Sequence, residues 1–391
     1  MDTALPLFPV TTVGSWPRSR DLLHAQRRLR QGAMDATNFR ALAREEIRRC
    51  VEAQEEAGVD LPTDGELGRD NFYSFVADKL DGVRLMSLAE MLDHVEDREG
   101  FERLLDTLDV PATAIRNPTC TGRLRRRESL AVEETAFLKT LTSHPVKVTL
   151  PGPYILTRAL WVPEVTRGVY ASKEELGEDV VALLQAEVAE LCRLGVGVIQ
   201  LDEPVLTELV FTQGRTRTFM CAALAARQDP AEELEFAVAL INRVTDTIHE
   251  LSAVRSALHV CRGNWSTREE TLLAGSYRPL APVFERIRVS QLVLEYATPR
   301  AGDLMAFGGK ELGLGVVNPR TEHVESPEEI VERVEEALRL MPADKLFLNP
   351  DCGFATFSER PMNASSVAEA KVRAMAEAAG HLRRVATPTR T

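Results

Sequence analysis

The sequence is short of cysteine, has no long apolar run and carries no excess of positive charge, and each shortage excludes a class of protein. Six cysteines at irregular spacing in 391 residues do not make a disulfide framework, so a reducing cytoplasm is expected. No apolar run reaches the length of a membrane span, and residues 1–6 lack the basic start and apolar core of a signal peptide. We therefore expect a cytoplasmic protein without a membrane partner.

The net charge of -12 spreads along the chain and does not collect in a tail. An acidic protein has no electrostatic attraction to phosphates, so no nucleic-acid partner is expected. The one basic run, at residues 123–127, is followed at once by Glu128 and lies among mixed charges. We interpret this run as a solvated face and not as an anion-binding patch.

Short runs rich in Val, Ile and Leu recur along the chain, and each ends in polar residues, Gly or Pro before a longer helical pattern begins. Strands that alternate with helices pair in parallel, and eight such units predict a closed (β/α)8 TIM barrel. The eight predicted strands are residues 10–13, 59–63, 146–150, 196–201, 257–260, 291–294, 312–317 and 345–348.

We expect residues 1–391 to form one such barrel, with helices at residues 173–194, 231–252, 326–340 and 364–385. One connection is too long for an ordinary barrel loop. Residues 64–145 form an insertion after the second strand, with helical pieces at residues 87–94 and 100–108. Because a long insertion after a barrel strand lies on the catalytic face, we expect it to cap the barrel mouth.

Barrel enzymes carry their chemistry at the carboxyl ends of the strands, so the residues that follow each strand are the candidates. They are Ser15 and Trp16 after the first strand, Glu66 after the second, Asp202 after the fourth, His259 and Cys261 at the fifth, Glu295 after the sixth, Arg320 after the seventh and Cys352 after the eighth. Glu66 and Asp202, taken singly, also suit the capping of the helices that follow them.

Four of these candidates have the chemistry of a zinc site. Cys261 and Cys352 supply two thiolates, His259 an imidazole and Glu295 a carboxylate, which are the ligands of tetrahedral zinc. Such an ion lowers the pKa of an incoming thiol, and Glu295 is the hardest ligand and hence the most exchangeable one. The alternative interpretation makes His259 a buried structural residue and the two cysteines small core residues.

Six short motifs lie at the ends of predicted strands, at residues 13–18, 64–66, 151–153, 200–204, 259–261 and 349–353. In this order they resemble the motifs of the catalytic barrel of cobalamin-independent methionine synthases, and the match runs over nearly the whole chain. The resemblance implies zinc bound by His259, Cys261, Glu295 and Cys352, and homocysteine bound at its carboxylate by Ser15 and at its ammonium by Glu66 and Asp202.

Two departures from the family concern the alkyl donor. Full-length members carry an N-terminal half that helps to hold folate polyglutamate, and these 391 residues show no counterpart of it. After the seventh strand the family usually has a histidine that acts as general acid, and Arg320 stands at that position here. His323, three residues further on, could substitute for it if the loop folds differently. Arginine stays protonated at neutral pH and cannot serve as the acid.

We therefore expect a zinc-dependent thiol alkyltransferase that methylates L-homocysteine to give methionine. Glu66 and Asp202 would orient the acceptor, and the donor would be methyltetrahydrofolate or a methyl-corrinoid, the latter carried by a corrinoid protein. Trp16 and Trp161 could present ring faces to a flat donor.

Two alternatives remain open at this stage. The first is epoxide opening or alkyl transfer by another thiol such as coenzyme M, as in epoxyalkane:coenzyme M transferase, which the chain also resembles. Arg320, Arg18 or Arg262 would then supply a fixed positive charge. The second is a thiol or metabolite sensor in which the metal is structural.

Overall fold

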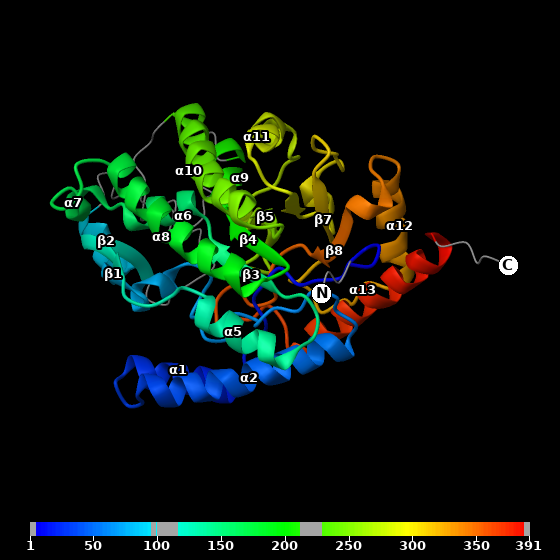
Figure 1. Cartoon of the computed structure of the whole chain (residues 1–391), viewed down its shortest axis with the longest axis horizontal. Coiled ribbons are helices and arrows are strands. Elements are labelled where there is room, and N and C mark those ends of the chain that lie inside the picture. The colour runs from blue at the N-terminus through cyan, green and yellow to red at the C-terminus, as the bar shows by residue number, and fades with distance from the viewer. Residues whose placement is uncertain (1–4, 95–98, 100–115, 212–228, 387–391) are drawn as a thin grey trace.

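A computed structural model of the chain describes residues 5–94, 99, 116–211 and 229–386, and its centre is a parallel six-stranded sheet (Figure 1). The sheet runs in the order β3-β4-β5-β6-β7-β8, so each strand pairs with its neighbours in sequence. The strands are β3 (Lys147–Pro151), β4 (Val198–Asp202), β5 (Arg255–Val260), β6 (Gln291–Leu294), β7 (Glu311–Val317) and β8 (Leu346–Pro350).

Two short segments, at residues 10–13 and 59–63, lie between β8 and β3 and connect them through hydrogen bonds. Thr11 donates its N–H to the carbonyl oxygen of Leu348 at 3.0 Å and forms a parallel bridge with Leu61. Lys147, in β3, then donates its N–H to the carbonyl oxygen of Pro62 at 3.0 Å. These contacts complete a (β/α)8 barrel in which the two segments stand in the places of the first and second predicted strands.

The two segments form isolated bridges instead of full strands, and proline explains why. Pro9 and Pro62 have no N–H to donate, which shortens the ladder on both sides of the first segment. Side chains replace the missing backbone contacts, because the Thr11 hydroxyl donates to the Leu61 carbonyl oxygen at 2.8 Å and the hydroxyls of Thr12 and Thr63 lie 3.0 Å apart.

A layer of buried side chains fills the barrel interior, as expected for this fold. Its apolar members come from both short segments and from four strands: Val13, Leu61, Val198, Ala257, Val293 and Phe347. On β3 the residue in register with Val198 is Lys147, which is buried and donates from Nζ to the Thr12 carbonyl oxygen at 2.9 Å. Burial lowers the pKa of Lys147 to about 7, although Asp202 and Glu66 act in the opposite direction.

Helices cover the outside of the barrel, and α8 packs on α10, α12 on α13 and α1 on α2 (Figure 1). The prediction for residues 173–194 is confirmed by α8, and the other three predicted helices differ from α10, α12 and α13 by one or two residues at each end. The longer helices are α1 (Arg20–Arg30), α2 (Ala36–Glu56), α5 (Val132–Leu141), α6 (Pro153–Leu160), α8 (Lys173–Leu194), α10 (Pro230–Leu251), α12 (Pro327–Leu338) and α13 (Ser365–Ala386).

The shorter helical elements connect these units. They are η1 (Ser74–Asp78), α3 (Leu88–Met91), η2 (Leu92–His94), α7 (Pro163–Thr166), α9 (Val205–Phe211), η4 (Glu269–Thr271), η5 (Arg278–Leu280), α11 (Ala281–Arg286), η6 (Pro299–Ala301) and η7 (Ala343–Lys345). Ser326 caps α12 through a reciprocal pair of hydrogen bonds with Glu329, as its Ser-Pro-Glu-Glu start predicts. Within the described ranges no helix is both long and apolar enough to cross a membrane.

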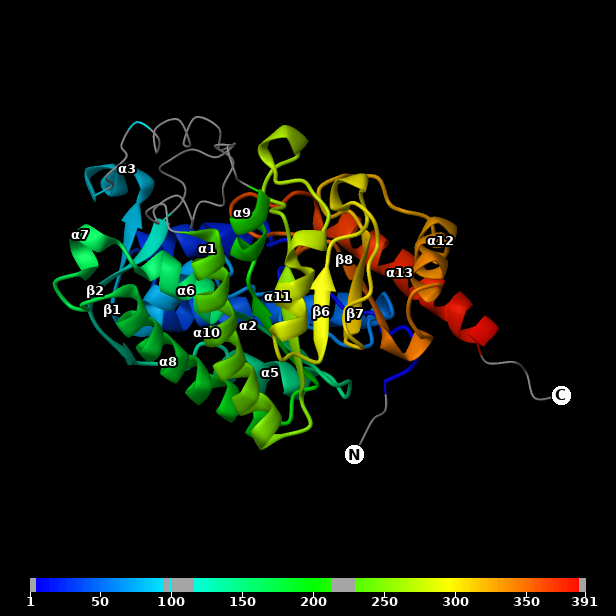
Figure 2. The same ribbon diagram turned by 90° about the horizontal axis from the view of Figure 1, so that it is seen from above.

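The insertion between the second segment and β3 contains a strand pair that the sequence pattern does not predict. β1 (Leu80–Ser87) and β2 (Arg116–Arg126) are antiparallel and lie at the end of the molecule opposite to α12 and α13 (Figures 1 and 2). The predicted helical piece at residues 87–94 corresponds to α3 and η2, and the one at residues 100–108 lies outside the described residues.

Replacing Lys147 by Met is expected to change how stability depends on pH. The pKa of Lys147 is lower in the folded protein than in the unfolded chain. Burial of the charged side chain therefore destabilises the fold most below pH 7, and this destabilisation disappears as the pH rises toward the unfolded pKa of 10.5. The free energy of unfolding of the wild type should therefore rise relative to that of Lys147→Met by up to about 1.4 kcal/mol per pH unit across this window.

Denaturant midpoints at pH 6.5, 8 and 9.5 would measure the difference. Lys139→Met, which removes an exposed lysine, is the matched control and should follow the wild type. Parallel curves for Lys147→Met and the wild type would contradict the prediction.

Candidate metal centre and active site

The carboxyl ends of the strands meet at a pocket whose walls carry most of the predicted site residues. In a parallel barrel all strands end on the same rim, so residues far apart in sequence come together there. The described residues that line the pocket are Val13, Ser15, Glu66, Phe72, Tyr73, Asp202, Pro204, His259, Cys261, Gly263, Asn264, Trp265, Cys352, Gly353, Thr356 and Phe357.

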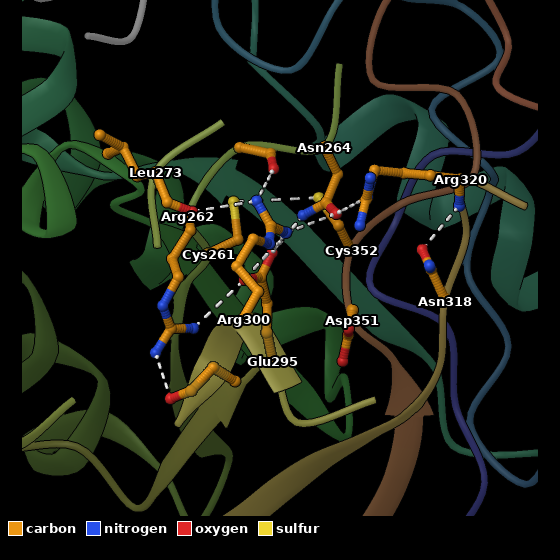
Figure 3. A network of polar contacts seen from close by, with 12 residues as sticks. Cys261, Arg262, Asn264, Leu273, Glu295, Arg300, Asn318, Arg320, Asp351 and Cys352 are labelled. Carbon is orange, nitrogen blue, oxygen red and sulfur yellow. Dashed lines mark hydrogen bonds and ion pairs between the residues drawn. The ribbon is translucent and has the colours of Figure 1, made fainter. Parts of the chain in front are cut away.

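Three of these residues could hold a metal ion. The ligand atoms of His259, Cys261 and Cys352 lie within 4.8 Å of one another, and all three side chains are buried. The two sulfur atoms are 3.9 Å apart (Figure 3). The hydrogen bond between the two thiols lowers the pKa of Cys352 and raises that of Cys261. Deprotonation to a thiolate is therefore favoured at Cys352.

His259 is oriented toward the two sulfurs by Asp202. These residues are register partners on β5 and β4, and His259 Nδ1 donates to Asp202 Oδ1 at 2.9 Å. Burial would lower the pKa of His259, but the hydrogen bond to Asp202 helps to raise it to about 10. The other ring nitrogen, Nε2, is buried and makes no hydrogen bond of ordinary geometry with any described residue, although the Cys352 thiol lies near enough to raise the pKa of the imidazole. An orphaned nitrogen beside two thiols is the arrangement that a metal ion would satisfy.

The donor set fits zinc. Two sulfurs bound at about 2.3 Å to a tetrahedral ion lie about 3.8 Å apart, close to the 3.9 Å between Cys261 and Cys352. A carboxylate that fixes the tautomer of a ligand histidine is the usual outer partner in zinc proteins. His259, Cys261 and Cys352 would therefore hold the ion, with room for a fourth ligand.

Glu295, the predicted fourth ligand, lies outside the group of three and is held by cations. Its carboxylate is 3.2 Å from Arg262 Nη1 and 3.2 Å from Arg300 Nη2, and it also accepts from the Asn264 amide (Figure 3). Burial would raise the pKa of Glu295, but Arg300 and Arg262 outweigh burial and keep that pKa below its ordinary value. The carboxylate is thus ionised but engaged elsewhere.

Asp351 ties the end of β6 to the end of β8. Its Oδ1 accepts from the backbone N–H groups of Tyr296 at 2.9 Å and Ala297 at 2.8 Å, directly after Glu295. Burial and the charge of Glu295 raise the pKa of Asp351 to about 7. Since Cys352 follows Asp351, this contact fixes the backbone of a predicted ligand relative to that of Glu295.

Glu66 and Ser15 face the pocket from the two short segments. Glu66 has a φ of 54°, uncommon for a residue with a side chain, and Asp64 supports this turn by accepting its N–H at 3.0 Å. Burial and the nearby Asp202 raise the pKa of Glu66, although Arg69 opposes them. Ser15 comes so close to Gly353 that a Cβ at residue 353 would lie 2.1 Å from Ser15 Oγ.

Aromatic residues that the sequence analysis missed form part of the pocket wall. Trp265 packs over Gly263, where φ is 84° and a Cβ would lie 1.8 Å from the indole ring, so only glycine allows this turn. Phe72 and Tyr73 reach the pocket from the insertion, and Phe357 from the loop after β8. The signal for Trp265 was its position directly after Asn264, within the stretch that carries two predicted ligands.

The other two tryptophans do not line this pocket. Trp16 is buried, donates from its indole nitrogen to the Ser365 hydroxyl at 3.0 Å and packs edge-on against Phe354. Trp161 ends α6 and is partly buried against the main core. The structure therefore gives no support to a donor-binding role for either ring.

The predicted cationic residues are also engaged with protein groups. Arg320 is buried, and it donates from Nε to the Asn264 oxygen at 3.1 Å and from Nη2 to Glu269 at 2.7 Å. Arg18 donates to four backbone carbonyl oxygens, and burial lowers its pKa to about 10. His323 has a side chain 65% exposed and lies 3.7 Å from Glu329, away from the pocket lining.

Solved structures share this fold. The B12-independent methionine synthase from Shewanella sp. W3-18-1 superposes with a TM-score of 0.71 at 22% identity, over 97% of this chain and 99% of that one. The putative vitamin-B12 independent methionine synthase from Listeria monocytogenes gives a TM-score of 0.65 at 21% identity, over 97% of this chain and 99% of that one. The fold is therefore that of the B12-independent methionine synthase barrels.

The family assignment follows from the sequence match. The chain belongs to the family described as cobalamin-independent synthase, catalytic domain, whose model matches residues 8–381. A methionine synthase from Thermococcus kodakarensis is 29% identical over 91% of this chain and 89% of its own length. A 5-methyltetrahydropteroyltriglutamate--homocysteine methyltransferase from Bacillus licheniformis is 25% identical over 97% of this chain, which spans only 44% of that protein.

Replacing Cys352 or Cys261 by Ser is expected to abolish metal retention. Each change removes one of three converging ligand atoms, so the dissociation constant for Zn²⁺ should rise by more than the roughly 10–100-fold that loss of an outer hydrogen-bond partner costs. Competition with a chromophoric chelator would measure this constant on the purified full chain.

Cys192→Ser is the matched control, because Cys192 is a free buried cysteine on α8. It should bind Zn²⁺ as tightly as the wild type. Unchanged affinity in either Cys352→Ser or Cys261→Ser would exclude that cysteine as a ligand.

Proposed function

We propose that this protein is a zinc-dependent methyltransferase that transfers a methyl group to the thiol of L-homocysteine, forming methionine. The observation that carries the proposal is the buried His259 Nε2, which makes no hydrogen bond of ordinary geometry with the described residues and lies beside two cysteine sulfurs, on the same pocket wall as Glu66 and Asp202. The names of the relatives agree with it: those matched over most of their own length are called methionine synthases, and a longer one is called a 5-methyltetrahydropteroyltriglutamate--homocysteine methyltransferase.

Zinc held by His259, Cys261 and Cys352 would lower the pKa of an incoming thiol, so that it binds as a thiolate at neutral pH. Asp202 holds the imidazole in the required tautomer through Nδ1. Glu295 would complete the ligand set in the absence of the acceptor, and it would be the ligand that the acceptor sulfur replaces.

The pocket offers the acceptor a set of contacts suited to an amino acid. Glu66 and Asp202 are two buried carboxylates that can pair with an ammonium group. The two hydrogen bonds that the Asp202 carboxylate accepts from described residues both go to Oδ1, so Oδ2 remains for the substrate. The Ser15 hydroxyl accepts from the Ala355 N–H at 3.3 Å and can direct its own proton toward the substrate carboxylate.

A sulfonate thiol such as coenzyme M fits this pocket less well. No lysine or arginine is found among the described lining residues, so a sulfonate would meet two carboxylates and no counter-ion. Arg18, Arg262 and Arg320, the arginines considered for that role, contact protein groups instead.

For the donor, the same pocket favours a methyl group that leaves without needing a proton. The nitrogen of methyltetrahydrofolate must be protonated as the methyl departs. The one histidine among the described lining residues is His259, which faces Asp202 and the sulfurs. When a thiolate attacks a methyl-corrinoid, the sulfur–carbon bond forms, the electrons of the cobalt–carbon bond remain on cobalt, and no proton is required.

Calorimetric titration of the zinc-loaded protein tests the acceptor. L-homocysteine should bind with release of about one proton per site, read from the heats in two buffers of different ionisation enthalpy. Coenzyme M, titrated in parallel, should bind at least tenfold more weakly.

Glu66→Gln separates the ammonium contact from the thiol contact. The affinity for homocysteine should fall by roughly tenfold or more, because a charge-assisted hydrogen bond is lost. The affinity for 3-mercaptopropionate, which lacks the amino group, should not change.

In the titrations of the wild type, binding of coenzyme M without binding of homocysteine would contradict the proposed acceptor and favour a thiol of the kind used by the epoxide-opening relatives.

The donor is tested by following methionine formation from homocysteine with methylcobalamin or methyltetrahydrofolate as methyl source. Methylcobalamin should react faster by roughly 10²-fold, since general-acid catalysis of that order is missing for the folate nitrogen. A faster reaction with methyltetrahydrofolate would show that a proton donor reaches the site.

A further inference from the structure

The Glu295 carboxylate is enclosed by three side chains that we call the Glu295 clamp: Arg262, Asn264 and Arg300. Arg262 Nη1 lies 3.2 Å from Oε2, while Arg300 Nη2 lies 3.2 Å from Oε1 and 3.4 Å from Oε2. Asn264 donates its amide to Oε1. Figure 3 shows these side chains together with Glu295. All of them are buried, and a buried carboxylate is tolerated only when it is paired in this way.

The clamp is rigid because its arginines are anchored independently of Glu295. Arg300 Nη1 donates to the carbonyl oxygens of Gly263 at 3.1 Å and Leu273 at 3.2 Å. Arg262 donates from Nε to the Gly275 carbonyl oxygen at 2.7 Å and lies 3.7 Å from the ring centre of Tyr277. The two guanidinium groups therefore keep their positions whether or not the carboxylate is present.

The two arginines weaken the Glu295 carboxylate as a ligand for a metal ion. Its lone pairs are directed at N–H donors and its negative charge is shared, so it is a poorer ligand than a free carboxylate. The clamp also lies next to the cluster, since Arg262 and Asn264 follow Cys261 along the chain. Glu295 lies outside the group of three ligand atoms, but its charge helps to raise the pKa of Cys261, so the carboxylate is near the cluster.

We propose that the Glu295 clamp is the receiving position for Glu295 when the acceptor thiol takes its place on the metal. The proposal rests on the proposed function, because it assigns the clamp to the exchange step of a metal-activated thiol. Arg262, Asn264 and Arg300 are positioning residues: they act through Glu295 and need not touch the substrate. The clamp stabilises both the metal-free state and the thiol-bound state relative to the state in which Glu295 binds the metal.

Arg300→Gln tests the proposal with two binding constants measured on the full chain. A weaker clamp releases Glu295 to the ion, so the thiol-free protein should bind Zn²⁺ roughly tenfold more tightly, the scale of one lost charged hydrogen bond. For the same reason L-homocysteine, which must displace a better-bound carboxylate, should bind the zinc-loaded variant roughly tenfold more weakly. Arg300→Lys, which keeps the charge and one donor, should restore most of both values.

The Glu295→Gln background distinguishes the clamp from a general effect of charge. Removing a nearby cation could itself favour Zn²⁺ and disfavour a thiolate. This electrostatic effect of Arg300→Gln would remain when Glu295 is also replaced by Gln. An effect of the clamp would disappear, because the clamp acts only through the carboxylate. Arg300→Gln should therefore change neither constant when Glu295 is already Gln, as a double-mutant cycle would show. Persistence of both changes in that background would overturn the proposal.

A purely structural role for Arg300 predicts a different pattern. Metal and thiol affinity would then fall together, along with the thermal unfolding temperature, and that outcome would also overturn the proposal. Arg288→Gln, which removes a surface pair with Asp246, is the control and should leave both constants unchanged. If no thiol binds the wild type, the proposed function fails, and the Zn²⁺ constant of Arg300→Gln still decides whether the clamp competes for Glu295.

Discussion

The hydrogen bond between Asp202 and His259 is the contact on which the rest of the site depends. It joins β4 and β5 at the rim of the barrel, where the two residues are register partners, and it decides which imidazole nitrogen faces the two sulfurs. Asp202 also lines the pocket beside Glu66. One carboxylate therefore links the parallel ladder to the candidate metal ligands and to the proposed acceptor contacts, and a shift of register between β4 and β5 would separate all three.

Much of the fold could be predicted, because its elements are locally encoded. Runs rich in Val, Ile and Leu marked the six strands of the sheet, and α8 begins and ends where its pattern does. The strand pair β1–β2 was missed because its pairing is nonlocal and because charged residues, Gly and Pro interrupt its apolar pattern. Arg126, within the run interpreted as a solvated face, is instead paired with Glu187 and Glu190 on α8.

The sequence allowed the candidate ligands to be predicted, because their residue types and positions at strand ends indicate metal binding. It did not allow prediction of the residues whose positions depend on how loops pack. His259, Cys261 and Cys352 stood out by residue type at strand ends, and the structure brings their ligand atoms together. The two arginines around Glu295 could not be foreseen, since they depend on the folds of two loops. Tryptophan shows the same limit: nothing in the composition tells which of the three rings reaches the pocket, and only Trp265 does.

Residues 261–265 supply, in unbroken succession, a candidate ligand, a clamp arginine, the glycine turn, the clamp amide and a pocket wall. An insertion or deletion there would disturb all five features at once, so this loop has little freedom to diverge. Phe72 and Tyr73, which reach the same pocket from the insertion, are neither predicted ligands nor clamp residues. New substrate preferences within this architecture should therefore evolve, or be engineered, through these two positions, while the 261–265 loop stays constant in length.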